Sequence, residues 1–530
     1  GQRALEHAHR MRCRERHVQH AHGDANHHQR GQDRHGDVQQ GHRQRGLQRL
    51  IDRHPVLRTT FHERQGDPLQ RVHPQAEICF AVHEAADWSG GVLEEHLAGE
   101  IYRPFNLATG PLFRVDVFRS PPHNPVMLVA LHHIVTDLWS LMIMLAELTK
   151  HYDEFTRGIP ANLKPLRAAY SDYVAHQAET LKGPEGERLW RFWREHLAGP
   201  LPPLKLPTDR PRPPAPTDKG AALHWACSVS LTSSLEHLAR SRKTSLFTVV
   251  LAAFQLLLHR YTGQEQIQVG TPKAGRTHKM ARVLGYFINP VVLKAKIDEN
   301  LTFSGFLDQV HAEVERVSEH DTFPFPLLVE RLAPTREQGH TPIFQVMLAW
   351  QKTTSAVEQS ATASIALGDE KQRAEVGNLV VGPVFLKQRA TPFDWALWVT
   401  EAVIEGKKQL RCMLEYRMAL FDEETIRRVL NNFETLLEGV SQNPDGRLTG
   451  LPLIHMHERH RIRQRSVAPP SSAGTASLLP TLFEDRVLNS PDAVALSQST
   501  QQLTYSELNS RANQLAHHLQ RLGVRAEKRV

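Results

Sequence analysis

Hydrophobic and polar positions change their spacing repeatedly along the chain, and this spacing predicts alternating strands and helices. Residues 125–131 (PVMLVAL) form a continuous apolar run of strand length, as expected for a strand buried on both faces. Residues 138–152 follow with apolar positions at helical spacing, and residues 245–261 form a long, mostly apolar stretch that predicts a buried helix. Residues 266–270 then indicate a short strand. This alternation predicts an α/β fold.

The pattern begins abruptly at Gly46. Residues 1–46 contain no Phe, Trp or Tyr and are rich in Arg, His and Gln. Such a segment cannot bury enough apolar area to offset its chain entropy, so we expect it to be disordered or a mistranslated gene start, rather than a His-rich tail that binds metal or polyanion. Residues 47–54 resemble the end of an amphipathic helix, and Pro55 then turns the chain into a predicted strand over residues 56–61.

Two stretches divide the rest of the chain. Residues 199–216 are too rich in proline for a helix or a central strand, which indicates an extended connector between two lobes. Residues 456–477 contain a run of Ser, Ala and Pro and indicate an inter-domain linker. After it, residues 478–530 regain order and include the amphipathic helix 506–522. We expect this last piece to be the incomplete start of another domain.

Composition narrows the classes of function. The net charge of +7 is concentrated in the first 46 residues, which disfavours a nucleic-acid partner. The four cysteines lie far apart without C-x-x-C spacing, which argues against a structural zinc site or a disulfide framework and fits a reducing cytosol. No apolar run has the length needed to span a bilayer, and the N-terminus has no signal-peptide core. We therefore expect a soluble, cytoplasmic protein.

The chemically most informative feature follows the predicted strand 125–131. His132 and His133 are adjacent there, and Asp137 lies four residues after the second histidine. Successive side chains of an extended segment point to opposite faces, so both rings cannot face one site, which disfavours a metal site. One ring is then buried while the other meets a cavity, where imidazole can take or position a proton near neutral pH. The alternative is a histidine pair that simply fills a core.

Several further motifs occur in order over residues 47–455. They are VLRTTF at 56–61, RPFNL to GPLFR at 103–114, YSDY at 170–173, LPTDRPRP at 206–213, GYFINP at 285–290, HD to PF at 320–325 and PIFQVM at 342–347. Together with HHIVTD at 132–137, they resemble the condensation domains of non-ribosomal peptide synthetases, whose active-site motif is H-H-x-x-x-D-G. Residues 478–530 resemble the opening of an adenylation domain.

The resemblance implies two chloramphenicol-acetyltransferase-like lobes in a V-shaped pseudo-dimer, with the active site between them. It assigns residues 47–198 to the N-terminal lobe, residues 199–216 to the connector and residues 217–455 to the C-terminal lobe. It also implies an acyltransferase, in which a carrier-bound aminoacyl amine attacks a carrier-bound acyl or peptidyl thioester to form an amide. The substrates would travel on the 4'-phosphopantetheine of upstream and downstream carrier proteins, with no directly bound cofactor or metal and an adenylation domain in the same parent chain.

The same resemblance gives roles to individual residues. His133 is the catalytic proton handler, His132 is its buried neighbour, and Asp137 is a structural residue paired with Arg58 across the fold. The candidate tunnel-lining residues are Leu138, Trp139, Ser140 and Asn289.

The chain departs from the family pattern at two places. The family usually has Gly where this chain has Leu138, and a side chain there narrows the space beside the thioester. With its neighbours, this residue suggests a domain that accepts an acyl or polyketide donor. Residues 1–46 also lack the family's opening S-x-x-Q-x-R-x-W motif. If that motif is missing from the protein, we expect a fragment that is unstable or inactive.

Other functions of the same fold stay open or are excluded. An epimerization domain shares the two histidines but usually carries Ser-Trp after the aspartate, where this chain has Trp139 and Ser140. A heterocyclization domain has aspartates in place of His132 and His133. A free-standing acyltransferase would lack residues 478–530. From another class, a non-catalytic platform that docks carrier proteins remains an alternative.

Overall fold

The chain divides into two compact units, residues 1–454 and residues 455–530, and each is considered by itself. A computed structural model describes residues 41, 44–86, 88, 90–120, 124–214, 217, 219–332, 341–351, 374–376, 379–382, 384, 390–404, 406–455, 458–460, 463, 479–498 and 501–525. The segment 1–46, expected to be disordered or mistranslated, therefore lies almost entirely outside the described residues.

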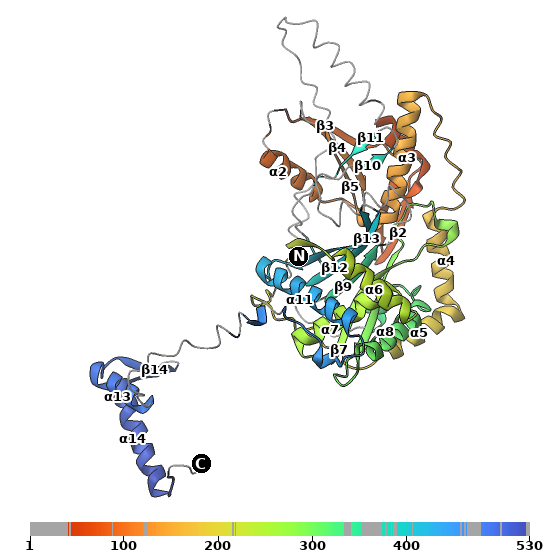
Figure 1. The fold of residues 1–530 in the computed structure, drawn as a ribbon. Helices are drawn as coiled ribbons and strands as arrows, with labels where there is room; N and C mark the ends of the chain where they lie inside the picture. The colour runs from red at the N-terminus through yellow and green to blue at the C-terminus, as the bar shows by residue number, and fades with distance from the viewer. Residues whose placement is uncertain are drawn as a thin grey trace, which may run out of the picture. The chain divides into compact units, whose positions relative to one another are not determined.

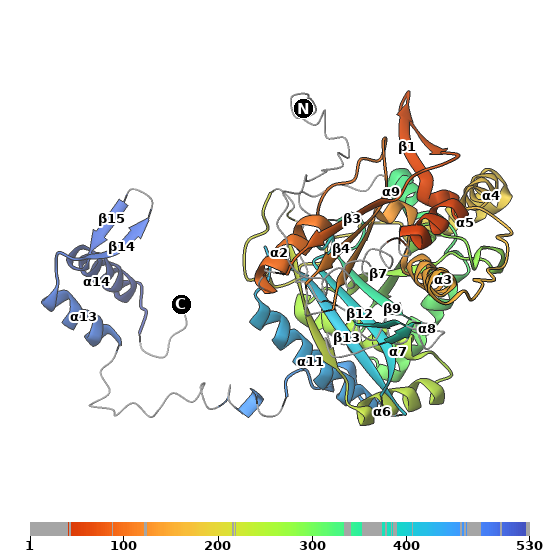
Figure 2. The same cartoon turned by 90° about the horizontal axis from the view of Figure 1, so that it is seen from above.

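The first unit is built on two main sheets with helices packed against them, which confirms the predicted α/β class (Figures 1 and 2). Residues 44–53 form its first continuously described helix. The next elements are η1 (Pro55–Arg58), β1 (Thr59–Arg64), β2 (Asp67–Val72), β3 (Cys79–Glu84), α2 (Gly90–Ile101), β4 (Phe113–Arg119), β5 (Val126–Leu131), η2 (His133–Val135) and α3 (Leu138–Arg157). The strand predicted at 56–61 is therefore partly wrong: Pro55 starts a 3-10 turn, because its fixed φ suits a first helical position.

The smaller sheet has the order β3-β4-β5, with β3 parallel and β5 antiparallel to β4. Side chains of β4 alternate between two small cores: Val115 packs with the helix 44–53 and α3, whereas Phe118 packs with α2. The continuous apolar run 125–131 does not mark the most buried strand. In the described residues β5 pairs only with β4, and Met127 is 41% exposed, whereas β4 is buried along almost its whole length because it lies between two strands.

The larger sheet has the order β6-β13-β12-β9-β7-β8, in which β9 runs parallel to both of its neighbours, β12 and β7. The other elements of the first unit that the described residues form are α4 (Tyr170–Lys182), α5 (Pro184–His196), β6 (Gly220–Ala226), α6 (Val229–Ser241), α7 (Leu246–Thr262), β7 (Gln266–Ala274), η3 (His278–Met280), β8 (Ile288–Lys296), α8 (Phe303–Ser318), α9 (Phe325–Leu332), β9 (Val346–Gln351), β10 (Ala374–Val376), β11 (Leu379–Val381), β12 (Trp395–Ile404), β13 (Lys407–Arg417), α11 (Glu423–Gln442) and η4 (Leu448–Gly450).

Helix α7 is the centre of the largest hydrophobic core. The side chain of Ser245 caps its first turn by accepting from the Thr248 N–H, and Gly263, with φ of 68°, ends it in a left-handed conformation. Nearly every residue between these caps is buried, because α6, α8 and α11 pack around it and the sheet lies beside it. The predictions of a buried helix at 245–261 and of a strand from residue 266 are confirmed.

The packing places the boundary between the two lobes earlier in the sequence than predicted. Trp193 and Leu197, in and just after α5, belong to the core of the six-stranded sheet, and the Trp193 indole donates to the His320 carbonyl. The assignment of residues 184–198 to the N-terminal lobe is therefore wrong, because the apolar face of α5 is buried against the other sheet. From here on, residues 44–169 are called the N-terminal lobe and residues 184–454 the C-terminal lobe.

The proline-rich connector is fixed to the C-terminal lobe rather than free. Leu204 and Leu206 are buried in its core. Asp209 accepts hydrogen bonds from the Asp422 N–H (2.7 Å) and the Thr425 hydroxyl (2.8 Å), and so caps the start of α11. The segment is extended, but these contacts make it a strap on the surface of one lobe.

The second unit contains α13 (Leu479–Asn489), the antiparallel hairpin β14 (Val494–Gln498) and β15 (Gln501–Thr504), and α14 (Tyr505–Arg521). Thr504 and Glu507 form a capping box at the start of α14. Across the described part of the chain, no single helix has both the length and the hydropathy to cross a membrane. Helices α6 and α7 have the required length and hydropathy only when taken as a pair, and the chain bends by 105° between them.

Candidate active site

The two histidines occupy the turn between β5 and α3. His132 is the N-cap of η2, and its Nδ1 accepts a hydrogen bond from the Ile134 N–H at 3.1 Å. Its half-buried ring meets the Phe105 ring edge-on, with 5.9 Å between the centroids. Burial, and then electrostatic interaction with the neighbouring His133, lowers the pKa of His132. His132 is thus a neutral residue that holds the turn.

His133 is exposed, and a backbone contact fixes its tautomer. Its Nδ1 lies 2.7 Å from the carbonyl oxygen of Thr136. A carbonyl can only accept, so Nδ1 carries the proton and Nε2 of the neutral ring has a free lone pair. No contact to Nε2 is found among the described residues. The imidazole can therefore accept a proton at Nε2 from a group that approaches from solvent or from a bound substrate.

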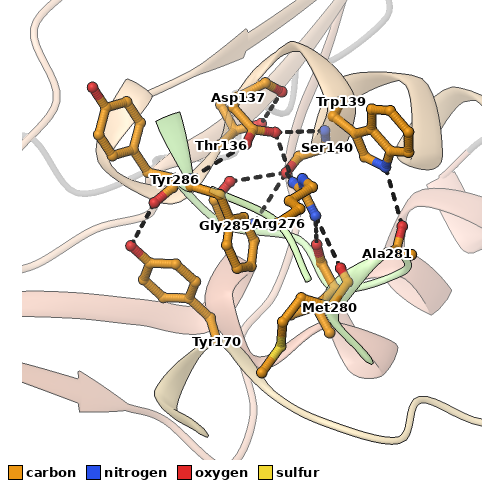
Figure 3. Close-up of polar contacts among 12 residues, drawn as sticks. Thr136, Asp137, Trp139, Ser140, Tyr170, Arg276, Met280, Ala281, Gly285 and Tyr286 are labelled. Atoms are coloured by element: carbon orange, nitrogen blue, oxygen red, sulfur yellow. Dashed lines mark hydrogen bonds and ion pairs between the residues drawn. The ribbon is translucent and has the colours of Figure 1, made fainter. Parts of the chain in front are cut away.

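Asp137 is buried and bonded on all sides. It is the N-cap of α3, where Oδ1 accepts from the Ser140 N–H at 2.7 Å. The same oxygen accepts from Nη2 of Arg276 at 2.7 Å, and Oδ2 accepts from the Phe287 N–H at 3.3 Å (Figure 3). The carboxylate thus joins the N-terminal lobe to the segment after β7 in the C-terminal lobe. It does not contact His133 directly.

The prediction that Asp137 pairs with Arg58 is wrong. Arg58 donates from Nη1 to the carbonyls of Ile51 and Asp52, both at 2.9 Å, and from Nε to that of His73 at 2.8 Å. The carbonyls at the end of the helix 44–53 have no partner within the helix, and a guanidinium satisfies them well. Arg58 therefore fixes the end of that helix and supports the site only indirectly.

Arg276, rather than Arg58, is the partner of Asp137 and lies at the centre of the site. Besides Asp137, it donates to the Ser140 hydroxyl at 2.6 Å and to the carbonyls of Met280 (3.1 Å) and Val283 (2.5 Å), and its guanidinium lies over the Phe287 ring. Burial lowers the pKa of Arg276 from its usual value, and Asp137 partly counters this effect. The Arg276–Asp137 contact is of the charge-assisted kind, which is stronger than a hydrogen bond between neutral groups.

Ser140 and Trp139 also join the two lobes. The buried hydroxyl of Ser140 donates to the Gly285 carbonyl (2.9 Å) and accepts from the Gly285 N–H (3.1 Å) (Figure 3). Ser140 is therefore a clamp between lobes and does not line an open tunnel, contrary to the prediction, because its hydroxyl is needed to satisfy buried backbone groups. The exposed Trp139 donates from its indole to the Ala281 carbonyl at 3.1 Å. Leu138 is the first residue of α3 and is half-buried.

Asn289 is half-buried at the start of β8, and its side chain is bonded throughout. Its amide donates to the carbonyls of Asp321 and Phe323, both at 2.7 Å, and its oxygen accepts from the Phe325 N–H at 2.8 Å. It thereby fixes the segment that leads into α9. These three bonds leave the side chain little freedom to contact a substrate, so the prediction of a tunnel-lining role has no support in this geometry.

Sequence reasoning missed three residues of this cluster. Arg276, Tyr170 and Tyr286 come from separate segments, and the Tyr170 hydroxyl donates to the Tyr286 carbonyl at 2.7 Å. Burial raises the pKa of both tyrosines, with a further contribution from nearby ionisable groups that include Asp137, so both stay protonated. Tyr170 and Tyr286 stood inside quoted motifs, but nothing in the spacing of Arg276 pointed to Asp137. In the described residues, no group of three or more His, Cys, Asp or Glu could hold a metal ion.

Comparison with known proteins agrees with this geometry. The sequence model of the Condensation domain matches residues 20–462, starting within the segment that the motifs did not cover, and that of the AMP-binding enzyme matches residues 483–530. Tyrocidine synthase 3 of Brevibacillus parabrevis is 33% identical over 485 residues, which cover 91% of this chain and 7% of the relative. Malpinin synthetase of Mortierella alpina is 32% identical over 499 residues, which cover 93% of this chain and 6% of that relative. The chain thus spans less than a tenth of these relatives.

Solved structures share the fold. A four-domain non-ribosomal peptide synthetase bound to AMP and glycine aligns with a TM-score of 0.69 at 20% identity, covering 91% of this chain and 36% of that one. The X-domain from teicoplanin biosynthesis also aligns with a TM-score of 0.69, at 23% identity, covering 78% and 90%. The family match extends over most of the chain, and it includes both lobes and the turn that carries His133. The chain therefore belongs to the condensation domain family.

Proposed function

We propose that this chain forms amide bonds in non-ribosomal peptide synthesis, as an acyltransferase acting on two carrier-bound substrates. Its membership of the condensation domain family supports this, as do relatives that are named as synthases of tyrocidine and malpinin. The substrates would be thioesters on the 4'-phosphopantetheine of upstream and downstream carrier proteins. The matched start of an AMP-binding enzyme at 483–530 supports an adenylation domain in the same parent chain.

The observation that carries the proposal is the fixed tautomer of His133. The bond from Nδ1 to the Thr136 carbonyl leaves Nε2 basic and free on an exposed ring. An amine nitrogen that attacks a thioester carbonyl forms a C–N bond, while the C–S bond breaks and the thiolate leaves. Nε2 accepts the proton that the nitrogen loses, and the imidazolium then returns it to the thiolate. No covalent acyl-enzyme is required in this sequence.

Asp137 has a structural part in this mechanism. Its oxygens are engaged by Arg276, Ser140 and the Phe287 N–H, so the site does not have the hydrogen-bonded Asp-His pair of a catalytic triad. The carboxylate instead fixes the start of α3, and the turn that holds the Thr136 carbonyl comes immediately before it. Correct placement of reacting groups is itself a large part of such catalysis.

The test uses the whole chain with two separately prepared carrier proteins, one loaded with an acyl or peptidyl thioester and the other with an aminoacyl thioester. We expect His133→Ala and His133→Gln to lower the rate of product formation, followed by mass spectrometry, by about 100-fold or more. The matched control is His237→Ala, because His237 is an exposed histidine on α6 in the other lobe. Unchanged amide formation in both His133 variants would refute the catalytic proposal.

The same assay decides between this function and a docking platform. One solved structure of the same fold is a complex of the teicoplanin X-domain with OxyB, which supports a platform as the second candidate. A platform would bind the loaded carrier proteins with equal affinity in the wild type and in His133→Ala, without forming product in either. Binding measured by fluorescence anisotropy, beside product formation, separates the two functions.

An epimerization domain would act on one carrier only. It would exchange the α-hydrogen of a bound aminoacyl or peptidyl group with solvent and would form no new C–N bond. Incubation of a single loaded carrier with the chain in deuterated water therefore tests this alternative. We expect no deuterium at the α-carbon above that found without the chain.

A further inference from the structure

Tyr286, in the segment just before β8, contributes an aromatic ring to the surroundings of His133. The two ring centroids lie 5.0 Å apart and the ring planes meet at 86°, an edge-to-face contact. Tyr286 belongs to the C-terminal lobe, whereas the other contact of the His133 ring, with Thr136, lies within its own turn. Through the half-buried Tyr286, the second lobe therefore reaches the imidazole.

The backbone around Tyr286 is held on both sides. Ser140 of the N-terminal lobe is bonded to both the N–H and the carbonyl of Gly285. The Tyr286 carbonyl accepts from the Tyr170 hydroxyl, and the Phe287 N–H donates to Asp137. Figure 3 shows these contacts, with the Tyr286 and Tyr170 rings on opposite sides of the Tyr286 backbone. Three consecutive residues are thus anchored, which fixes the backbone from which the Tyr286 ring extends.

Gly285 is required for this arrangement. A Cβ at this position would lie 2.2 Å from Cδ2 of Tyr170, far inside contact distance. Any larger residue would push Tyr170 away and release the bond that fixes the Tyr286 carbonyl. The segment is therefore shaped to bring its backbone against Ser140 and Tyr170, with the Tyr286 ring directed to His133.

Two contacts together restrict the His133 ring. The hydrogen bond at Nδ1 fixes one edge of the imidazole but allows the ring to swing about that bond. The Tyr286 ring lies against the imidazole and limits this swing. The catalytic value of such a contact comes from orientation, since small misplacements of a reacting group reduce the rate strongly.

We propose that Tyr286 is a positioning residue, whose ring holds the His133 imidazole so that Nε2 faces the attacking amine. The clamp from Ser140 to Gly285 sets that ring in place, so the site is complete only with both lobes joined. The inference rests on the proposed function of His133. The contact is made by the ring, so this role does not require the hydroxyl.

The kinetic test compares three variants in the two-carrier assay. We expect Tyr286→Leu to lower kcat about tenfold and to change KM for the aminoacyl carrier by less than about twofold, because the loss is one of orientation. Tyr286→Phe keeps the ring and should recover most of this loss. Tyr102→Leu removes an exposed tyrosine after α2 and serves as the matched control with full activity. An equal loss of kcat in Tyr286→Phe and Tyr286→Leu would overturn the proposal.

A second measurement reports directly on the state of the His133 ring. In 15N spectra of histidine side chains, the His133 signals are identified by their absence in His133→Gln. We expect the wild type to show the form protonated at Nδ1, and both Tyr286→Leu and Ser140→Ala to show signals averaged over ring orientations or tautomers. If Tyr286→Leu melts cooperatively and its His133 signals are unchanged, the proposal that Tyr286 positions His133 is contradicted.

The two readouts also separate the two proposals. If Tyr286→Leu disturbs the His133 signals while His133→Ala retains full activity, then the proposed function fails and the positional contact stands. If His133→Ala is inactive and Tyr286→Leu leaves both signals and kcat unchanged, then the function stands and the role of Tyr286 fails.

Discussion

In the N-terminal lobe, three strands carry two small groups of buried side chains, one on each face. In the C-terminal lobe, one face of the six-stranded sheet shares a large core with α6, α7, α8 and α11, and the other face carries a small cluster. The exposed His133 comes from the smaller lobe, at the end of β5, a strand with a partner on one side only among the described residues. Arg276 and Tyr286, which fix this turn, come from the larger lobe.

This difference shows how a reactive side chain can be exposed and still held in place. Val135 fixes the segment around the exposed His133 in the core of its own lobe, and Asp137 and Ser140 tie it to Arg276 and to backbone groups of the other lobe. Leu284 of the C-terminal lobe is also buried in the core of the N-terminal lobe. In the proposed mechanism, the lobe with the larger core therefore holds the turn, and the other lobe supplies the proton acceptor.

The largest expected effect comes from breaking the pair that joins the lobes. Arg276→Met leaves the Asp137 carboxylate buried without its partner, which should cost about 3–5 kcal/mol of unfolding free energy. Denaturant unfolding measures this loss, and amide formation should fall with it. The control is Arg210→Met, whose pair with Asp422 is about half exposed on both sides and should contribute about 1 kcal/mol or less. Equal costs for the two variants would show that the buried pair does not hold the lobes together.

The next effect tests whether the core of the C-terminal lobe contributes more to stability than the packing of β5 in the N-terminal lobe. Leu257→Ala removes a buried side chain from α7 in the C-terminal lobe and should cost about 2–5 kcal/mol. Met127→Ala in β5 should change the unfolding free energy by about 0.5 kcal/mol or less, because this side chain is 41% exposed. Thermal unfolding of both variants measures the contrast. Similar losses at the two positions would contradict the observed packing of β5.

A pH effect should be found in the N-terminal lobe. Burial alone would raise the pKa of Glu147, but hydrogen bonds and charge from His54 and Arg53 outweigh it, and the pKa is lowered. A lowered pKa in the folded state means that the stabilisation is present above the unfolded pKa, about 4.5, and is lost as the pH falls below it.

The difference in unfolding free energy between wild type and Glu147→Gln should therefore be present at pH 6 and shrink as the pH falls below 4.5, by about 1–3 kcal/mol at most. The measurement is urea unfolding at several pH values. A difference that grows on acidification would have the opposite sign and contradict this account.

The smallest expected effect concerns the donor. Leu138, where the family usually has Gly, led us to expect a preference for an acyl donor over an aminoacyl donor. Leu138→Gly should reduce that preference by about tenfold or less, since a few methylenes in a pocket discriminate only modestly. Competing acetyl-type and aminoacyl thioesters in one reaction measure it. A wild type that prefers the aminoacyl donor would remove the basis of this prediction.

Much of the fold could be predicted because it depends on local pattern. The buried helix α7 follows from an apolar stretch between a serine cap and a glycine, both visible in the sequence. Burial of β5 could not be predicted, because a strand's exposure depends on how many partners it has in its sheet. For the same reason, the apolar face of α5 indicated a helix but did not identify the lobe against which it packs.

The site divides in the same way. The turn of His132 and His133 and the cap at Asp137 are local features, since each depends on neighbouring residues, although the cap itself was not predicted. The partner of Asp137 was decided only by the tertiary structure: Arg58 is nearer in sequence but satisfies the end of a helix, and Arg276 reaches the carboxylate from 139 positions away. Contacts between distant segments depend on how whole sheets and helices pack, and no local spacing records them.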